Sequence, residues 1–324
     1  MKRFFLIFLP LAMLLSFAGC RRCPLGAVDA SSEASAVLLL AGLDDAAENA
    51  DALMLVSVWE ARRSMAVMQI PRDTYFEADG VDKLNGVYAS RRYAGDSEDE
   101  ALSALSSAVS ETFGVALDGT VAFRASALVA AVDALGGVRV QLPEALVLED
   151  FRYEKGEHLL SGAEAEAFVR YRKGYATGDL GRVEAQKLFL SAFLRAVREQ
   201  ADVASLFRLL LSMRSAVITD LSLPRALSLG LYIHARLPQL SACYFTLPGE
   251  AVYSMEHWYF VPNRVAAEEV LSEYFPITSA FDPRARLYNA QDPAQQVVYT
   301  DKNYPYTVYT EEDLSSMHIP TKKQ

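Results

Sequence analysis

The 324-residue sequence predicts an α/β fold in which helices cover both faces of a central sheet. Two observations support this. Apolar runs of strand length alternate along the chain with segments of helical periodicity. In addition, 52% of the residues are hydrophobic and 22% are charged, a balance that gives a large buried core and excludes a disordered chain.

The strand predictions come from continuous apolar runs, which are typical of strands buried on both faces. Two of these runs are separated only by the short polar segment 60–64, so we expect them to pair as a hairpin. Another run is stopped by Pro143. The predicted strands are 36–43, 52–59, 65–70, 138–142 and one near 242–247.

Two capping boxes predict helix starts, one at Ser97 with Glu100 and one at Ser161 with Glu164. Apolar residues follow each box at helical spacing, and glycine at 114 ends the first of these helices. Apolar periodicity alone predicts the others. The predicted helices are 97–113, 125–135, 161–172, 183–197, 203–215, 223–236 and 263–275.

The N-terminus reads as an export signal, since a basic start precedes an apolar run over residues 4–18. At about 15 residues the run is short for a spanning helix, which needs about 20. It ends in Ala18-Gly19-Cys20 and resembles a bacterial lipobox, with Phe17 in place of the usual leucine. Cys20 is therefore the expected lipidation site, and an uncleaved signal-anchor is the alternative. Both place the rest of the chain at the extracytoplasmic face of the cell membrane.

We expect four regions along the chain. They are a signal peptide (1–19), a lipidated tether of small and polar residues (20–35), one main domain (36–275) and a C-terminal tail (276–324) in which helical and strand periodicity stops.

Net charge and cysteine content exclude other classes. The formal charge of −10 argues against nucleic-acid binding, so an anionic ligand must be held by a local cluster of arginine and lysine. The three cysteines are too few for a disulfide scaffold. Cys20 and Cys23 form a C-x-x-C without partners at metal-ligand spacing.

An acidic loop follows the first predicted strand and contains Asp44, Asp45, Glu48 and Asp51. Carboxylates at the carboxyl end of a strand face the crevice in which α/β sheets bind ligands. Oxygen ligands of this kind suit Mg²⁺, which shares phosphate oxygens and keeps waters. The alternative is a solvated acidic loop.

Three further segments carry cations. Arg72 and Asp73 follow the third strand, and Lys83 lies two residues before Asn85. Later, three arginines fall within thirteen residues, followed by a glutamine: Arg170, Arg172, Arg182 and Gln186. The planar fork of arginine suits phosphate, so these side chains are candidates for an anion clamp. A surface salt bridge, a helix cap and a solvated helix end are the alternative interpretations.

Taken together and in this order, these segments resemble the LytR–CpsA–Psr family of cell-wall enzymes. The resemblance runs from about residue 36 to residue 275. It rests on segments 38–44, 51–56, 70–75, 83–85, 133–138, 169–172, 178–182 with Gln186, 219–222 and 246–250.

The resemblance implies a three-layer α/β/α fold with a central mixed sheet and an apolar tunnel that holds a polyprenyl chain. It implies transfer of a glycopolymer such as teichoic acid, as a phosphate ester, from a polyprenyl-pyrophosphate carrier to a peptidoglycan hydroxyl. Matched residue by residue, Asp44 and Asp51 correspond to the Mg²⁺-side carboxylates. The pyrophosphate clamp and its supporting residues correspond to Arg72, Arg170, Arg172 and Arg182, with Asp73, Lys83, Asn85 and Gln186.

The sequence departs from the family pattern where arginine is usual, at Ala46, Asn49 and Ala185. Each change removes one charge from the clamp. A different donor, a substituting cation (Arg91, Arg92 or Lys173) or weakened catalysis would follow. A pyrophosphatase and a non-catalytic lipid-carrier binder or wall regulator are the competing functions.

One geometric prediction tests the assignment. The four arginines should meet at one pocket mouth beside Asp44 and Asp51. An apolar cavity lined by helices 101–113, 125–135 and 183–197 should open beneath them, because a polyprenyl chain must leave water.

Overall fold

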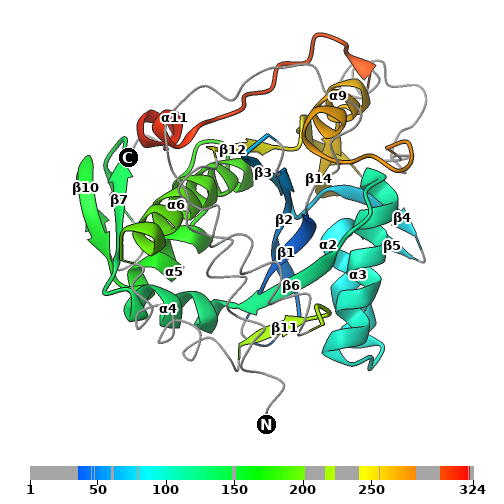
Figure 1. The fold of residues 1–324 in the computed structure, drawn as a ribbon, viewed down its shortest axis with the longest axis horizontal. Helices are drawn as coiled ribbons and strands as arrows, with labels where there is room; N and C mark the ends of the chain where they lie inside the picture. Colours follow the sequence, from blue (N-terminus) through cyan, green and yellow to red (C-terminus); the bar gives the residue numbers. More distant parts are fainter. Residues whose placement is uncertain are drawn as a thin grey trace.

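A computed structural model describes residues 36–44, 46, 48–59, 62–78, 80–147, 151–200, 216–222, 241–254, 256–281, 300–319 and 321 (Figure 1). The predicted signal, tether and Cys20, and the predicted helices 203–215 and 223–236, lie outside these residues. Within the described part of the chain, none of the helices is long and apolar enough to cross a membrane.

A six-stranded mixed sheet forms the middle of the molecule, in the order β11-β6-β1-β2-β3-β12. β1 lies antiparallel to β2 and parallel to β6, while β3 lies antiparallel to β2 and parallel to β12. The predicted strands and the β2–β3 hairpin are confirmed. The strands are β1 (Ala36–Leu43), β2 (Ala50–Trp59), β3 (Ser64–Ile70), β6 (Gly119–Arg124), β11 (Val217–Thr219) and β12 (Ser241–Thr246).

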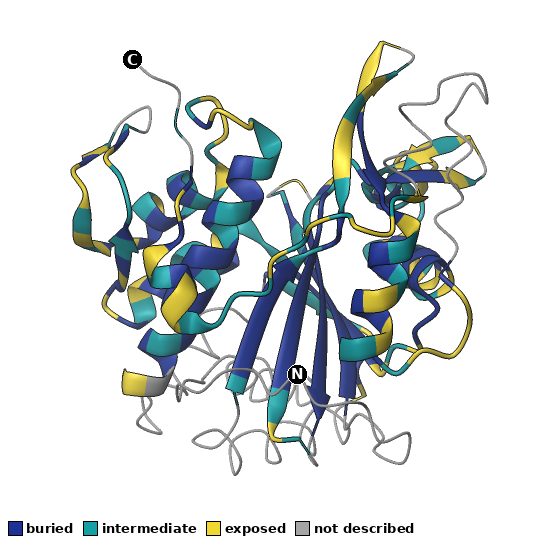
Figure 2. Ribbon diagram, turned by 90° about the horizontal axis from the view of Figure 1, so that it is seen from above, coloured by how far each residue is buried: buried dark blue, intermediate teal, exposed yellow. Residues whose placement is uncertain are grey.

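The sheet is buried on both faces because its strands are apolar throughout. Alternate side chains of a strand point to opposite faces. In β1, Leu38 and Leu40 therefore enter one core, while Val37 and Leu39 enter the other. Figure 2 shows the buried strands between two layers of helices, which is the three-layer α/β/α arrangement.

One layer is formed by α4 (Ala125–Ala134), α5 (Gly162–Arg170) and α6 (Asp179–Gln200). The other is formed by α2 (Leu84–Tyr93), α3 (Glu98–Phe113) and α9 (Arg264–Tyr274). Both predicted capping boxes form, at the starts of α3 and α5. Gly114 takes the left-handed conformation (φ 63°) that ends α3. α5 stops at Arg170, earlier than predicted, because Tyr171 is extended.

Four smaller strand pairs surround the sheet, and sequence patterns predicted only β7 among them. They are β4 (Tyr75–Ala78) with β5 (Val81–Lys83), β7 (Val138–Leu142) with β10 (Gly156–Leu160), β8 (Leu146–Val147) with β9 (Arg152–Tyr153), and β13 (Gly249–Ser254) with β14 (His257–Pro262).

The described C-terminal residues pack against both cores. Leu314, Met317 and Ile319 belong to the core that contains Leu38, and Tyr306 and Val308 pack against the core that contains Leu39. Tyr309 exchanges two backbone hydrogen bonds with Tyr244 of β12, at 2.8 and 2.9 Å. The short helix α11 (Glu311–Ser316), which was not predicted, begins with a capping box at Thr310 and buries Leu314.

The parallel strands β1, β3, β6 and β12 all end at the same edge of the sheet. Asp44 follows β1, Arg72 follows β3, and α4 follows β6 directly. This edge therefore gathers chain segments that are far apart in sequence.

Candidate active site

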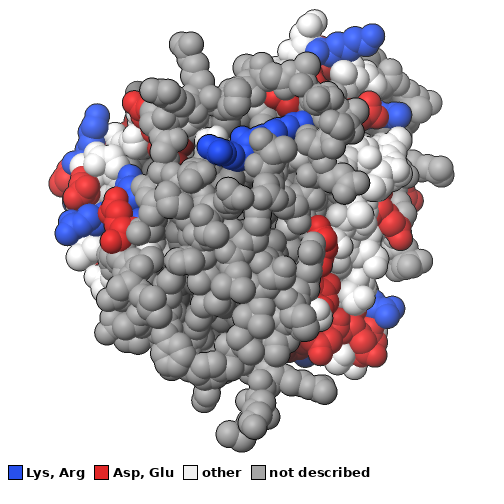
Figure 3. All heavy atoms as spheres, in the orientation of Figure 1, with Lys and Arg blue, Asp and Glu red and all other residues white. Residues whose placement is uncertain are grey.

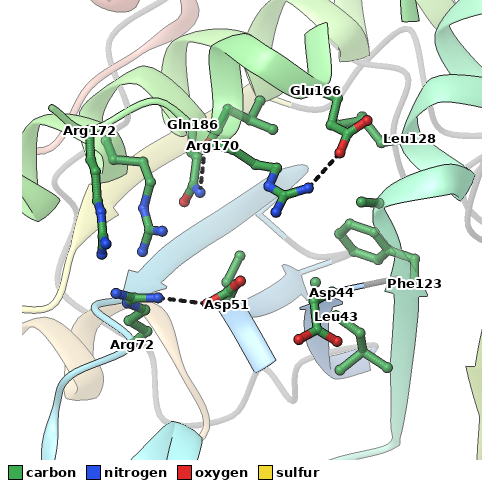
Figure 4. A pocket seen from close by; sticks show the side chains of 15 residues that line it. Leu43, Asp44, Asp51, Arg72, Phe123, Leu128, Glu166, Arg170, Arg172 and Gln186 are labelled. Carbon is green, nitrogen blue, oxygen red and sulfur yellow. Dashed lines mark hydrogen bonds and ion pairs between the residues drawn. The ribbon is translucent and has the colours of Figure 1, made fainter. Parts of the chain in front are cut away.

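A pocket of about 330 Å³ opens at this edge of the sheet. Its charged lining comes from five places in the chain: the end of β1, the start of β2, the loop after β3, the end of α5 and the start of α6. These residues are Asp44, Asp51, Arg72, Glu166, Arg170, Arg172 and Arg182 (Figure 4). The four arginines and two aspartates of the sequence prediction thus line one pocket. Elsewhere, on the face drawn in Figure 3, charges of both signs lie in small groups.

Arg72 is held by three carboxylates. Its Nη1 donates a 2.7 Å hydrogen bond to Asp51, and its Nε lies 3.7 Å from Asp73 and 3.8 Å from Asp179. Burial disfavours its charge, but Asp179, Asp51 and Asp73 together outweigh that effect and raise the pKa of Arg72. The guanidinium is therefore fixed and fully charged.

Arg182 lies deeper in the pocket, with 6% of its side chain exposed. Its Nη2 contacts Asp179 at 2.8 Å. Burial lowers the pKa of Arg182, against the pull of Asp179, and the neighbouring charges of Arg72 and Arg172 lower it further. Its Nε is buried without a hydrogen-bond acceptor. A buried guanidinium with an unsatisfied donor among like charges is suited to receive an anion.

Asp179 joins the two arginines, since its Oδ1 lies between Arg72 and Arg182. Sequence reasoning placed Asp179 in a family segment but assigned it no role. Its spacing of three residues from Arg182 at a helix start was a usable signal for an ion pair. Its contact with Arg72 depends on the tertiary fold.

Arg170 and Arg172 flank the end of α5. Arg170 is exposed over 58% of its side chain and its Nη1 pairs with Glu166 at 2.6 Å. In Figure 4, Arg172 points toward Arg72, whereas Arg170 turns toward Glu166. Arg172 thus faces the centre of the arginine cluster, and Arg170 lies at its outer side.

Asp44 and Asp51 supply the carboxylates of the pocket. Asp44 accepts hydrogen bonds of 2.8 Å from the backbone N–H of Glu48 and from the side chain of Asn49. Burial would raise the pKa of Asp44, but the hydrogen bonds from Asn49 and Glu48, with the charge of Arg170, lower it overall. The carboxylate is therefore ionised at neutral pH.

These two carboxylates suit a particular kind of metal binding. Among the described residues, no group of three or more His, Cys, Asp or Glu side chains could hold a metal ion. Mg²⁺ is commonly held by one or two carboxylates, with substrate phosphates and waters supplying its other ligands. Two carboxylates beside four arginines fit that mode of binding.

The predicted supporting residues lie in different places. Lys83 donates a 3.1 Å hydrogen bond to Asp73, whose other carboxylate oxygen lies 3.7 Å from Arg72. Neither Lys83 nor Asp73 lines the pocket. Asn85 lies in the first turn of α2 and is not among the residues that line the pocket. Gln186 does line the pocket, where it accepts from Gln69 at 2.9 Å and donates to the carbonyl of Val169 at 3.0 Å. It thereby ties α6 to β3 and to the end of α5.

An apolar cavity of about 120 Å³ lies next to the charged pocket. The two share Ala52, Phe123, Leu128, Val169 and Gln186 in their linings. The cavity continues between the sheet, α4 and α6, where Leu40, Met54, Ala131, Phe189, Leu190 and Phe193 line it.

The prediction that helix 101–113 lines this cavity is wrong. That segment forms α3, whose Leu102 and Leu105 belong to the core on the opposite face of the sheet. Helix periodicity shows that one side is buried but cannot show which face of the sheet it covers.

The three positions without the usual arginine are filled differently. Asn49 donates a side-chain hydrogen bond to Asp44. Ala185 is fully buried in the core, and Ala46 is exposed. The proposed substitutes Arg91, Arg92 and Lys173 are not among the described residues that line the pocket. Arg91 pairs with Asp96 at 2.6 Å instead.

Comparison with known proteins agrees with this arrangement. Residues 20–275 match the LytR_cpsA_psr family. The chain belongs to this family. The match covers both layers of helices, the sheet and every residue that lines the pocket.

Several relatives have names that describe an activity. Polyisoprenyl-teichoic acid–peptidoglycan teichoic acid transferase TagU of Oceanobacillus iheyensis is 25% identical over 73% of this chain and 74% of its own length. TagU of Halalkalibacterium halodurans is 29% identical over 61% of this chain and 64% of its own length. The cell wall biosynthesis protein LcpA of Corynebacterium glutamicum is 29% identical over 51% of this chain and 36% of its own.

Solved structures share the fold. Bacillus subtilis TagV aligns with a TM-score of 0.59 at 22% identity, over 74% of this chain and 98% of that one. TagT bound to LIIa-WTA aligns with a TM-score of 0.58 at 24% identity, over 80% and 98%. These likenesses establish the α/β fold with its mixed central sheet.

Proposed function

We propose that this protein is a phosphotransferase that moves a glycopolymer, such as a teichoic acid, from a polyprenyl-pyrophosphate carrier to peptidoglycan. One observation carries the proposal: four arginines from three chain segments meet at the mouth of an apolar cavity. A ligand that fits both parts has a pyrophosphate attached to a hydrocarbon chain. The names of the related transferases support the same donor and acceptor.

In the proposed reaction, an acceptor hydroxyl oxygen forms a bond to the phosphorus that carries the glycopolymer. The bond from that phosphorus to the bridging oxygen breaks, and the polyprenyl phosphate leaves with the electron pair. Negative charge builds on the leaving phosphate, so Arg72, Arg172 and Arg182 stabilise the transition state more than the ground state. The hydroxyl proton passes to solvent.

We further propose that Asp44 and Asp51 hold Mg²⁺ together with the pyrophosphate. Bound there, the ion would neutralise phosphate charge, as in other phosphoryl transfers. Arg72 donates to Asp51, so the arginine cluster also fixes the orientation of one carboxylate.

We also propose a location at the extracytoplasmic face of the membrane, where lipid-linked polymers meet the wall. The predicted export signal and the lipobox-like sequence that ends in Cys20 support it. A membrane anchor would also hold the pocket near a donor whose prenyl chain resides in the bilayer.

The test is a product assay with the full chain in detergent. The probes are a polyprenyl-pyrophosphate-linked saccharide with a labelled sugar and peptidoglycan sacculi stripped of polymer. We expect sugar label to become covalently attached to sacculi and polyprenyl phosphate to be released in equal amount. Arg182→Ala should reduce the rate by about ten- to a hundredfold, since a charge-assisted contact is lost.

The matched control is Arg264→Ala, which removes an exposed arginine from a surface pair with Glu268. It should leave the rate unchanged. Release of polyprenyl phosphate with all sugar label in solution would assign a hydrolase instead. Donor that stays bound without turnover would assign a lipid-carrier binder. Either result contradicts the transferase proposal.

A further inference from the structure

The β13–β14 hairpin presents two aromatic side chains to solvent. Tyr253 and Trp258 lie directly opposite each other on the two strands, with ring centroids 5.3 Å apart and planes tilted by 57°. Each residue is 59% exposed. In Figure 2 the hairpin rises beyond the sheet, with exposed residues along its projecting part. A paired Tyr and Trp left in water is unusual unless a ligand covers it.

The base of this hairpin is fixed to the pocket. Phe260 of β14 donates its backbone N–H to the carbonyl of Asp73 at 2.8 Å, and it bridges to Thr74. Asp73 follows Arg72 directly, so hairpin and arginine loop share one backbone contact. β13 continues from β12, whose carboxyl end lies at the pocket edge of the sheet.

Side-chain contacts make the attachment rigid. Tyr259 donates a 2.6 Å hydrogen bond to Asp82 and packs edge-to-face on Tyr75, with centroids 5.6 Å apart. Tyr75, Tyr259 and Val261 form a small buried cluster at the base of the hairpin. Because side chains alternate along a strand, Trp258 points away from the face that Tyr259 buries. The aromatic pair is thus a preformed platform beside the site.

Charge around the platform narrows the choice of ligand. Segment 249–262 contains Glu250 and Glu256 and no lysine or arginine. Lys83 lies 5.2 Å from the ring of the buried Tyr259, but its charge is paired with Asp73 at 3.1 Å. An anionic polymer or an anionic lipid surface would be repelled there, since both need basic residues for attraction. An uncharged sugar ring is not repelled, and its C–H-bearing face packs on the electron-rich face of an aromatic ring.

We propose that Tyr253 and Trp258 bind neutral sugar rings of the acceptor glycan strand and hold it beside the arginine pocket. This rests on the proposed transferase function, in which the acceptor is a polysaccharide. In this proposal the uncharged aromatic platform binds the acceptor, and the cationic arginines bind the anionic donor.

Tryptophan fluorescence gives a direct test. The chain has two tryptophans, and Trp59 is only 5% exposed, so Trp258 is the tryptophan that reports binding at the surface. The probe is a neutral oligosaccharide of N-acetylglucosamine. We expect saturable quenching or a blue shift on addition, absent in Trp258→Ala. Co-sedimentation of the full chain with stripped sacculi should weaken about tenfold in Trp258→Ala and in Tyr253→Ala.

Tyr93→Ala is the matched control, because Tyr93 is 97% exposed at the end of α2 and lies outside the hairpin. It should bind sacculi normally. A spectral change with anionic phospholipid vesicles but not with the oligosaccharide would overturn the proposal in favour of membrane contact. Normal sacculus binding by both hairpin variants would also overturn it.

Donor binding separates this proposal from the transferase proposal. Both hairpin variants should retain wild-type binding of a prenyl pyrophosphate while losing transfer of the labelled sugar to sacculi. If the wild type binds sacculi through the hairpin but never turns over the donor, the transferase function fails and the platform stands.

Discussion

Replacement of Asp179 by asparagine tests how the arginine cluster is stabilised. The Asp179 carboxylate lies 2.8 Å from Arg182 and 3.8 Å from Arg72, and only 26% of it is exposed. Asp179→Asn keeps the shape but removes the charge that offsets two guanidinium groups. Loss of the charge of one partner in a largely buried ion pair destabilises a protein by about 2 kcal/mol. The melting temperature should therefore fall by roughly 4–8 °C.

The same substitution should make the pocket more responsive to an anion. Without Asp179, the arginines have more uncompensated positive charge, so a prenyl pyrophosphate should stabilise the variant more than it stabilises the wild type. The assay is thermal unfolding with and without geranylgeranyl pyrophosphate. The control is Glu268→Gln, which breaks an exposed 3.0 Å pair with Arg264 and should cost at most about 0.5 kcal/mol.

Two results would refute this reasoning. One is a melting temperature for Asp179→Asn equal to that of Glu268→Gln, which would mean that the arginines do not need the carboxylate. The other is an equal or smaller gain in melting temperature with the pyrophosphate, which would mean that the ligand binds away from the cluster.

Three other substitutions test separate parts of the structure. Ala131→Leu should fill part of the apolar cavity, leave the free energy of unfolding within about 1 kcal/mol of wild type and reduce retention of prenyl lipid in native mass spectrometry. Burial raises the pKa of Glu164, but hydrogen bonds from Ser161 and Tyr153 outweigh this effect and lower the pKa below its ordinary value of 4.5. The stability that the ionised Glu164 contributes is therefore present above pH 4.5 and lost as the pH falls below it. Glu164→Gln should accordingly make the free energy of unfolding less dependent on pH in the acid range. Cys20→Ser should abolish incorporation of labelled fatty acid, and unchanged labelling would favour a signal-anchor.

Sequence patterns predicted the helices and strands whose formation depends on residues close together in the sequence. The capping box at Ser97 forms because both of its hydrogen bonds lie within four residues. The apolar run of β1 predicts a strand because any sheet that buries both faces needs such a run. The β13–β14 hairpin was not predicted, because burial along β14 has no period of two: His257 and Trp258 are exposed, and the four residues Tyr259–Pro262 are all buried.

The site was predictable only in part, because some of its contacts join residues that are far apart in the sequence. The resemblance to a family identified the arginines and aspartates one by one, and the fold brings them to one pocket. The role of Asp179 depends on Arg72, more than a hundred residues earlier, so no local spacing could reveal it. The side of the sheet that α3 covers depends on strand order, which is why the cavity lining was predicted incorrectly.

A co-crystal structure of the full chain with a polyprenyl pyrophosphate tests the central claim most directly. Our account predicts that both phosphates lie within hydrogen-bond distance of Arg72, Arg172 and Arg182, and that the prenyl chain enters the cavity between α4 and α6. Phosphates bound outside this pocket, or a prenyl chain on the surface with the cavity unchanged, would contradict it.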